Sequence, residues 1–263
     1  MNSYNRHSII FYVIIAYGTT WCITISLIFY YHSINYEIRE LWHALGSIGP
    51  TIAGLTIIST RKRKKGLIQL KDRFLKVNDK KLFLIALSPL IILALILPFE
   101  AIFGLFDYNT FLKNNNLRDI KSFILFFLPS LCYGLFEEIG WRGYLLPELQ
   151  NFYTALKSTI ILTVIWWLWH IPMFFYRFDL YFSLIFMFPL MLSGSIAFTF
   201  LFNQSGGSVL MIIIFHISYD IVTSNEISLI AIIVVSALFI FIDIRAIKVY
   251  GIESLSQKEK ILI

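Results

Sequence analysis

Of the 263 residues, 58% are apolar and 17% are aromatic, whereas only 14% are charged, and the mean hydropathy is +0.74. A soluble domain carries roughly 25% charged residues, so this composition excludes a soluble globular protein and predicts a polytopic membrane protein. The net charge of +6 does not indicate a nucleic-acid partner, because the basic residues lie in a few loops beside apolar segments, where anionic lipid headgroups are the expected partner.

A helix needs about 20 apolar residues to cross a bilayer core of about 30 Å. By this criterion the sequence predicts an all-α bundle of about eight transmembrane helices, forming one integral-membrane domain over residues 1–263. The expected spans are residues 9–31, 41–60, 82–106, 122–146, 157–175, 180–202, 207–223 and 228–244.

The segment 66–77, between the second and third spans, places Leu67, Leu70, Phe74 and Leu75 at near-helical spacing among lysines and arginines. This pattern predicts a short interfacial helix, with a solvated connector as the alternative.

The orientation follows from the positive-inside rule. The basic stretch 61–65 and the lysines and arginines after it lie between the second and third spans. Placing this loop in the cytoplasm, with an even number of spans, places both termini there as well. The composition, rich in phenylalanine, isoleucine and asparagine, is typical of a low-GC bacterium, so we expect a multi-pass protein of a bacterial plasma membrane.

The fourth span contains two adjacent carboxylates, Glu137 and Glu138, followed by Arg142. Ionisable residues at membrane depth are costly and are usually functional. On a helix, Glu138 and Arg142 face each other four residues apart, whereas Glu137 points about 100° away. We therefore expect Arg142 to hold Glu138 and leave Glu137 available as a general base. The alternative is a structural salt bridge near the membrane boundary.

Two later spans each contain one of the chain's five histidines. His170 follows a tryptophan-rich run, with Trp166 one turn earlier on the same helix face, where it can wall a pocket. His216 and Asp220 are also one turn apart, and such a pair can bind a metal, orient an imidazole or form an oxyanion-binding corner. The alternatives are an interfacial or core histidine for His170 and a structural polar pair for His216 and Asp220.

The depths of these residues agree. At 1.5 Å per helical residue, Glu137, His170, His216 and Asp220 lie roughly 6–18 Å from the cytoplasmic edge of their spans. Three helices therefore direct polar side chains to one region, which predicts a cavity in the cytoplasmic half of the bilayer. The candidate catalytic residues are Glu137, Glu138, Arg142, His170, His216 and Asp220.

The ordered motifs Glu-Glu-x-x-x-Arg (137–142), aromatic-x-x-x-His (166–170) and His-x-x-x-Asp (216–220) resemble those of the CPBP family. This family comprises the CAAX proteases and bacteriocin-processing enzymes and is also called the Abi family. The resemblance covers about residues 120–223, and the segments 49–54 and 143–147 are similar to the family's flanking segments. The second motif usually opens with Phe, whereas this chain has Trp166, whose larger ring would narrow the pocket.

The resemblance implies an intramembrane endopeptidase with the motif residues as catalysts, and it leaves open both a metal-dependent and a glutamate-dependent mechanism. From the side chains we favour a mechanism that requires no cofactor, in which Glu137 and His170 activate water and His216, with Asp220, stabilises the oxyanion. Because a carboxylate cannot donate a hydrogen bond, Asp220 must be protonated or must act only by orienting His216. The alternative is a zinc ion bound by His170, His216 and Asp220, with Glu137 as the base.

The expected partners are a peptide or small membrane-associated protein as substrate, and the lipid bilayer. The expected role is bacteriocin or signal-peptide processing, or self-immunity. Two other functions stay open at this point. One is a non-catalytic bacteriocin immunity protein that binds a peptide. The other is a proton-coupled transporter with Glu137, His170 and Asp220 as a relay, which the lack of an internal repeat disfavours.

Overall fold

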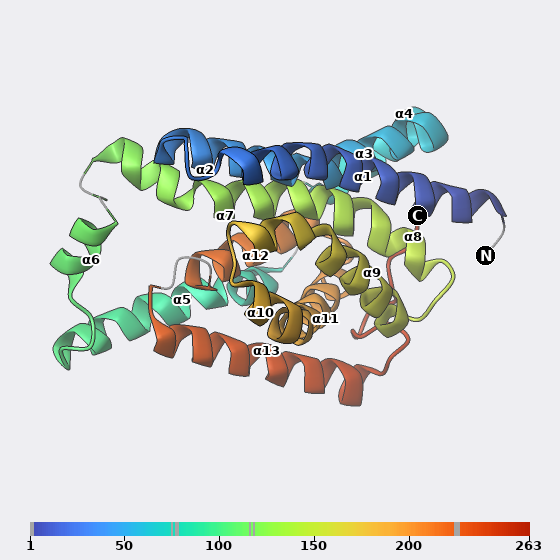
Figure 1. Cartoon of the computed structure of the whole chain (residues 1–263). Helices are drawn as coiled ribbons and strands as arrows, with labels where there is room; N and C mark the ends of the chain where they lie inside the picture. The colour runs from blue at the N-terminus through green and yellow to red at the C-terminus, as the bar shows by residue number, and fades with distance from the viewer. Residues whose placement is uncertain (1–2, 75, 77–78, 116, 118, 224–226) are drawn as a thin grey trace.

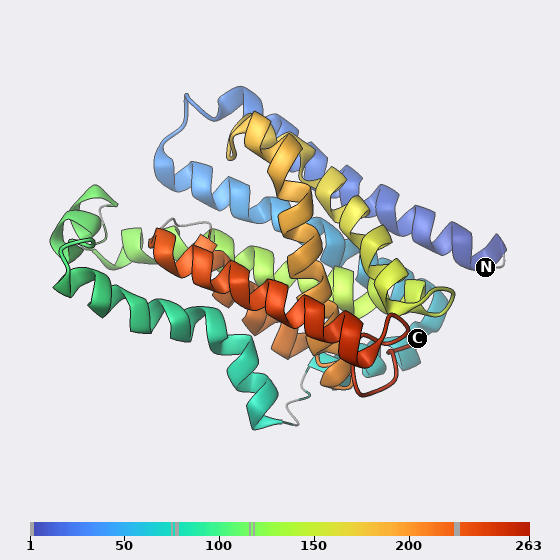
Figure 2. The same ribbon diagram turned by 90° about the horizontal axis from the view of Figure 1, so that it is seen from below.

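The computed structural model describes residues 3–74, 76, 79–115, 117, 119–223 and 227–263. Their apolar runs form helices that pack side by side (Figure 1, Figure 2), since backbone groups at membrane depth must bond within their own segment. The α-helices are α1 (Ser3–Tyr30), α2 (Tyr36–Leu45), α3 (Gly49–Ile57), α4 (Arg63–Phe74), α5 (Lys80–Ile102), α6 (Tyr108–Asn114), α7 (Ile120–Gly140), α8 (Leu146–Gln150), α9 (Ala155–Trp169), α10 (Leu180–Phe182), α11 (Phe188–Gln204), α12 (Val209–Thr223) and α13 (Leu229–Tyr250). Short 3-10 or π turns join some of them: η1 (Gly46–Ile48), η2 (Ile58–Lys62), η3 (Trp141–Leu145), η4 (Ile171–Phe175) and η5 (Ser183–Met187).

The predicted all-α membrane bundle is confirmed. Among the described residues, six helical segments are long and apolar enough to cross a membrane, and α9 and α12 are shorter apolar helices. Together these eight segments follow the predicted spans in chain order. The six long segments are His7–Tyr30, Tyr36–Phe74, Lys80–Ile102, Ile120–Gln150, Leu180–Gln204 and Leu229–Tyr250.

The segment between the second and third spans is helical, as predicted. It forms α4, which buries Gly66 and Leu70. Leu70 lies so close to Gly143 that a Cβ atom added to this glycine would come within 2.9 Å of Leu70 Cδ1. Leu75 of the predicted pattern lies outside the described residues. The connector α4 is therefore packed against the helix that carries Arg142.

The fourth span is longer than the predicted 122–146. It begins at Ile120, passes from α7 into the π turn η3 directly after Gly140, and continues as α8 to Gln150. The backbone N–H of Trp141 is shared between the carbonyl oxygens of Glu137 and Glu138. Such π turns inside α-helices occur frequently at functional sites. Here the widened turn follows the two glutamates and contains Arg142.

The fifth span differs from the predicted 157–175 because α9 ends at Trp169. His170 forms the junction, and the chain continues as the 3-10 turn η4, with Pro172 in its first positions. Proline lacks an N–H group and disfavours the α conformation in the residue before it, so Pro172 favours an end of the α-helix at this point. His170 therefore lies at a helix end and not within a helix.

Helix α7 lies between two sets of helices. It packs against α3 on one side and α12 on the other, as Figure 1 shows. The α3 contact is unusually close, because a Cβ atom on Gly140 would lie 2.3 Å from the carbonyl oxygen of Pro50. Thr51 also donates a hydrogen bond to the carbonyl oxygen of Phe136. The two helix backbones thus meet within one turn of the glutamate pair.

The chain after α13 folds back onto the ends of other helices and was not anticipated from the sequence. The N–H of Ala155, in the first turn of α9, donates to the carbonyl oxygen of Glu253 at 2.9 Å. Gln150 Nε2 donates to the carbonyl oxygen of Ile261 at 2.9 Å, and the N–H of Ile261 donates to Asn203 Oδ1 at 3.2 Å. This segment therefore links α8, α9 and α11.

The α3–α7 contact yields the first prediction. Gly140→Ala places a methyl group against backbone atoms of Pro50 that cannot rotate aside. We expect a destabilisation of about 1–3 kcal/mol, typical of overpacking, measured as a lower Tm in thermal unfolding of the detergent-solubilised protein. The matched control is Gly18→Ala, because a Cβ atom there meets nothing within 4 Å. Equal Tm values for the two variants would contradict the contact.

Candidate active site

The predicted ion pair between Glu138 and Arg142 is present. Arg142 Nη1 lies 2.7 Å from Glu138 Oε1, and both side chains are fully buried. Arg142 Nη2 also donates to Ser195 Oγ at 3.1 Å, and the guanidinium lies 4.9 Å from the ring centroid of Phe198. Arg142 thus ties α7 and η3 to α11.

Glu137 points to different neighbours, as its place in the helix predicts. Its Oε2 accepts a hydrogen bond from Trp141 Nε1 at 2.8 Å and another from Trp166 Nε1. The side chain is only 1% exposed. The carboxylate of Glu137 is therefore held by two indole N–H groups and not by Arg142.

His170 has a defined tautomer. Its Nδ1 lies 2.8 Å from the carbonyl oxygen of Trp166. A carbonyl oxygen can only accept, so Nδ1 carries the hydrogen and, in the neutral ring, Nε2 is an acceptor. The ring is packed between Trp166 and Trp169, with centroid distances of 5.8 and 4.8 Å. His170 can therefore accept a hydrogen bond from water through Nε2.

His216 lies between two carboxylates. Its Nδ1 is 2.8 Å from Glu138 Oε1, and its Nε2 is 3.6 Å from Asp220 Oδ1. The His216–Asp220 pair therefore shares one face of α12, as predicted. Glu138 binds His216 and Arg142 through the same oxygen, so it joins α7 to α12.

Trp166 is the residue on which these groups converge. Its indole donates to Glu137, lies edge-on to His216 with a centroid distance of 5.6 Å, and lies 5.1 Å from the guanidinium carbon of Arg142. Its carbonyl oxygen binds His170. Side chains from α7, η3, α9 and α12 thus surround one ring, and all of them point into the bundle.

The residues proposed for a zinc site do not fit a metal in this arrangement. Both ring nitrogens of His216 face carboxylates, which leaves Nε2 of His170 as the one open imidazole nitrogen of the proposed ligand set. In the part of the chain that the structure describes, no group of three or more His, Cys, Asp or Glu side chains is placed to hold a metal ion. No step is therefore assigned to a metal here.

A second buried polar cluster, which sequence analysis missed, lies one turn from Glu137. Arg177 Nη1 lies 3.1 Å from both carboxylate oxygens of Glu40. His43 Nδ1 lies 2.9 Å from the hydroxyl of Tyr176 and 3.3 Å from that of Tyr133. The sequence signal for it was Glu40-x-x-His43, an acid and a histidine on one face of an apolar span. The cluster joins α2 and α7 to the turn that follows His170.

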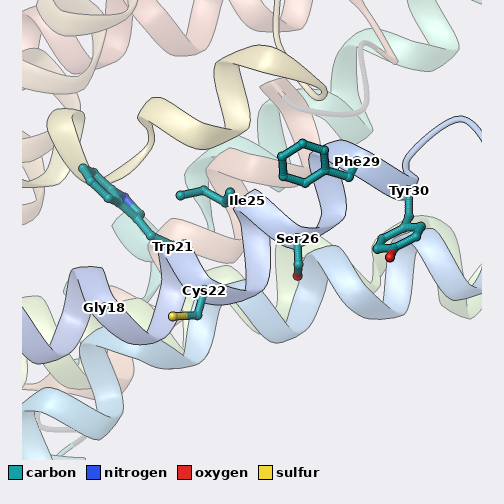
Figure 3. Close-up of a pocket in the computed structure, with 7 residues that line it drawn as sticks. All are labelled: Gly18, Trp21, Cys22, Ile25, Ser26, Phe29 and Tyr30. Atoms are coloured by element: carbon teal, nitrogen blue, oxygen red, sulfur yellow. The ribbon is translucent and has the colours of Figure 1, made fainter.

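A shallow apolar groove lies on α1 and contains none of the candidate catalytic residues (Figure 3). Three of its side chains, Ile25, Phe29 and Tyr30, are exposed, which suits contact with lipid. On the same helix, Trp21 Nε1 donates to the carbonyl oxygen of Trp169 at 3.0 Å. Helix α1 therefore supports the end of α9 through Trp21, and its buried Tyr12 packs edge-on against Trp141 at a centroid distance of 5.6 Å. The groove is lined by Gly18, Trp21, Cys22, Ile25, Ser26, Phe29 and Tyr30.

The chain is similar to known membrane proteases. Residues 119–222 match the family model of the Rce1-like type II CAAX prenyl endopeptidases. The chain is also similar to CAAX prenyl protease 2 of Methanococcus maripaludis, with 27% identity over 187 residues, which cover 65% of this chain and 67% of the relative. The matched region contains all six candidate catalytic residues. These two similarities support the resemblance to the CPBP family of CAAX protease-like membrane endopeptidases.

Proposed function

We propose that this protein hydrolyses a peptide bond within the membrane by using Glu137 and His170 to activate a water molecule. Glu137 takes a proton from the water, and the water oxygen bonds to the peptide carbonyl carbon. The carbon–nitrogen bond then breaks, and the proton passes to the leaving nitrogen. The products are a carboxylic acid and an amine. His170 orients the same water by accepting its second hydrogen at Nε2.

His216 is the proposed donor to the oxyanion. Its Nδ1 donates to Glu138, so the imidazolium form has a second N–H, at Nε2, that can donate to the negative oxygen of the tetrahedral intermediate. Asp220, at 3.6 Å from Nε2, supports this role by orienting the imidazole. Glu138 and Arg142 hold His216 in place from the opposite side.

The observation that carries the proposal is the convergence of Glu137, His170 and His216 around Trp166. These residues come from three helices, and each is less than 10% exposed. Burial excludes bulk water and strengthens electrostatic interactions with a reacting group. The similarity to known proteins supports the same chemistry, because residues 119–222 match a family model of endopeptidases.

The proposed substrate is a peptide or a small membrane-associated protein, cleaved in bacteriocin or signal-peptide processing or in self-immunity. The proposed location is a bacterial plasma membrane with both termini in the cytoplasm. The basic stretch 61–65, at the junction of η2 and α4, supports this orientation by the positive-inside rule. The relative in Methanococcus maripaludis is named a CAAX prenyl protease, whereas this proposal requires only an extended peptide.

The general base is tested by Glu137→Gln. An amide cannot accept the proton of water, so cleavage of candidate peptides by the purified protein should fall about 10²–10⁴-fold. The matched control is Glu148→Gln on the same continuous helix, where the glutamate pairs with Lys62 at 3.6 Å, away from the site. Retained cleavage in Glu137→Gln, or equal loss in both variants, would argue against Glu137 as the base.

The metal-free mechanism is tested by chelation. We expect wild-type cleavage to persist after dialysis against a strong chelator, because Glu137 and His170 activate water without a metal in the proposed mechanism. Metal content and peptide cleavage are measured on the same samples. Activity that disappears with the chelator and returns with zinc would replace this mechanism with the zinc alternative.

A further inference from the structure

Two tryptophans bind the same atom of Glu137. Trp141, one turn later on the same continuous helix, donates to Oε2 at 2.8 Å, and Trp166 donates to it from α9. Both rings are buried, with exposed fractions of 0% and 6%. Hydrogen bonds to an ionised carboxylate are roughly twice as strong as neutral ones, and they are strengthened further away from water. Oε2 is therefore anchored on two sides.

We propose that Trp141 and Trp166 are positioning residues, which fix Glu137 so that its other oxygen, Oε1, receives the proton of the attacking water. This inference rests on the proposed function. Because both donors bind Oε2, the Glu137 side chain is held in one rotamer, with Oε2 turned toward the two indole rings. Oε1 is then the basic atom presented to the substrate side, and the proton moves from the water oxygen to Oε1.

Trp166 also orients His170, the second residue of the pair that activates water. Its carbonyl oxygen binds Nδ1 of His170 at 2.8 Å, which leaves Nε2 as the acceptor. Its indole binds Glu137. One residue thus orients the acid through its side chain and the imidazole through its backbone, so the two groups keep a fixed relation to the same water.

The two tryptophans contribute differently. Trp141 is four residues after Glu137, so its bond restrains the side chain only relative to its own helix. The bond from Trp166 crosses from α9 to α7 and restrains Glu137 relative to His170. The ring of Trp166 is itself held by the guanidinium of Arg142 and the edge of His216. We therefore expect Trp166 to matter more for catalysis than Trp141.

The kinetic test uses Trp166→Phe and Trp141→Phe, which keep an aromatic ring and remove only the donor-bearing part. We expect kcat for peptide cleavage to fall about 10–100-fold in Trp166→Phe, with KM nearly unchanged, and to fall less in Trp141→Phe. The control is Trp167→Phe, because Trp167 donates to the carbonyl oxygen of Ser183 at 3.2 Å and not to Glu137. An unchanged kcat in Trp166→Phe, or an equal loss in Trp167→Phe, overturns the inference.

A spectroscopic test does not depend on activity. Ultraviolet resonance Raman spectra report the hydrogen bonding of indole N–H groups, and the chain has six tryptophans. Glu137→Ala should shift the signal of strongly bonded indoles, whereas Glu148→Ala should not. An unshifted signal in Glu137→Ala overturns the inference even if the protein cleaves peptides. A shifted signal in a protein whose wild type cleaves no peptide upholds the indole contacts and refutes the proposed function.

Discussion

The buried carboxylate of Glu138 joins the helices that carry the candidate site. Its Oε1 lies 2.7 Å from Arg142 and 2.8 Å from His216, and all three side chains are almost wholly buried. A buried charge costs several kcal/mol unless it is paired with good geometry. Helices α7 and α12 must therefore pack so that a guanidinium and an imidazole reach the same oxygen. This requirement fixes the rotation of α7 about its axis.

The rotation of α7 in turn determines the surroundings of Glu137. Adjacent helical residues point about 100° apart, so when Glu138 faces α12, Glu137 must face another part of the bundle. There it meets indole N–H groups, which stabilise the carboxylate without adding a positive charge. Two chemically identical side chains thus acquire different surroundings. One is compensated by cations and ties helices together, and the other keeps an oxygen available for chemistry.

The features that could be predicted from the sequence are those that depend on helical periodicity. The order of the spans, the Glu138–Arg142 pair, the His216–Asp220 pair and the separate direction of Glu137 all follow from hydropathy and from spacings of one or four residues. The end of α9 could also be predicted, because Pro172 lies two residues after His170. The predicted span 157–175 does not take this proline into account.

Other features depend on how distant helices cross, and no local pattern encodes this. The bond between Trp166 and Glu137 joins residues 29 positions apart, and that between His43 and Tyr176 joins residues 133 apart. The π turn after Gly140 adds a residue to one turn, and Pro147 in the first turn of α8 follows it, but the presence of this proline does not by itself predict a π turn. The membrane depths predicted from the sequence place the catalytic candidates in one region. Only the contact between Trp166 of α9 and Glu137 of α7 identifies Trp166 as their common neighbour.

The segment after α13 has a consequence for how the protein is made. Gln150 and Ile261, which bond to each other, are separated by 111 positions in the chain. During synthesis, α8 and α9 enter the membrane long before the segment that binds them is made. The hydrogen bonds from this segment can form only after α13 has been inserted. The ends of these helices are therefore held only by their neighbours until translation is nearly finished, so the nascent protein acquires its final helix arrangement late.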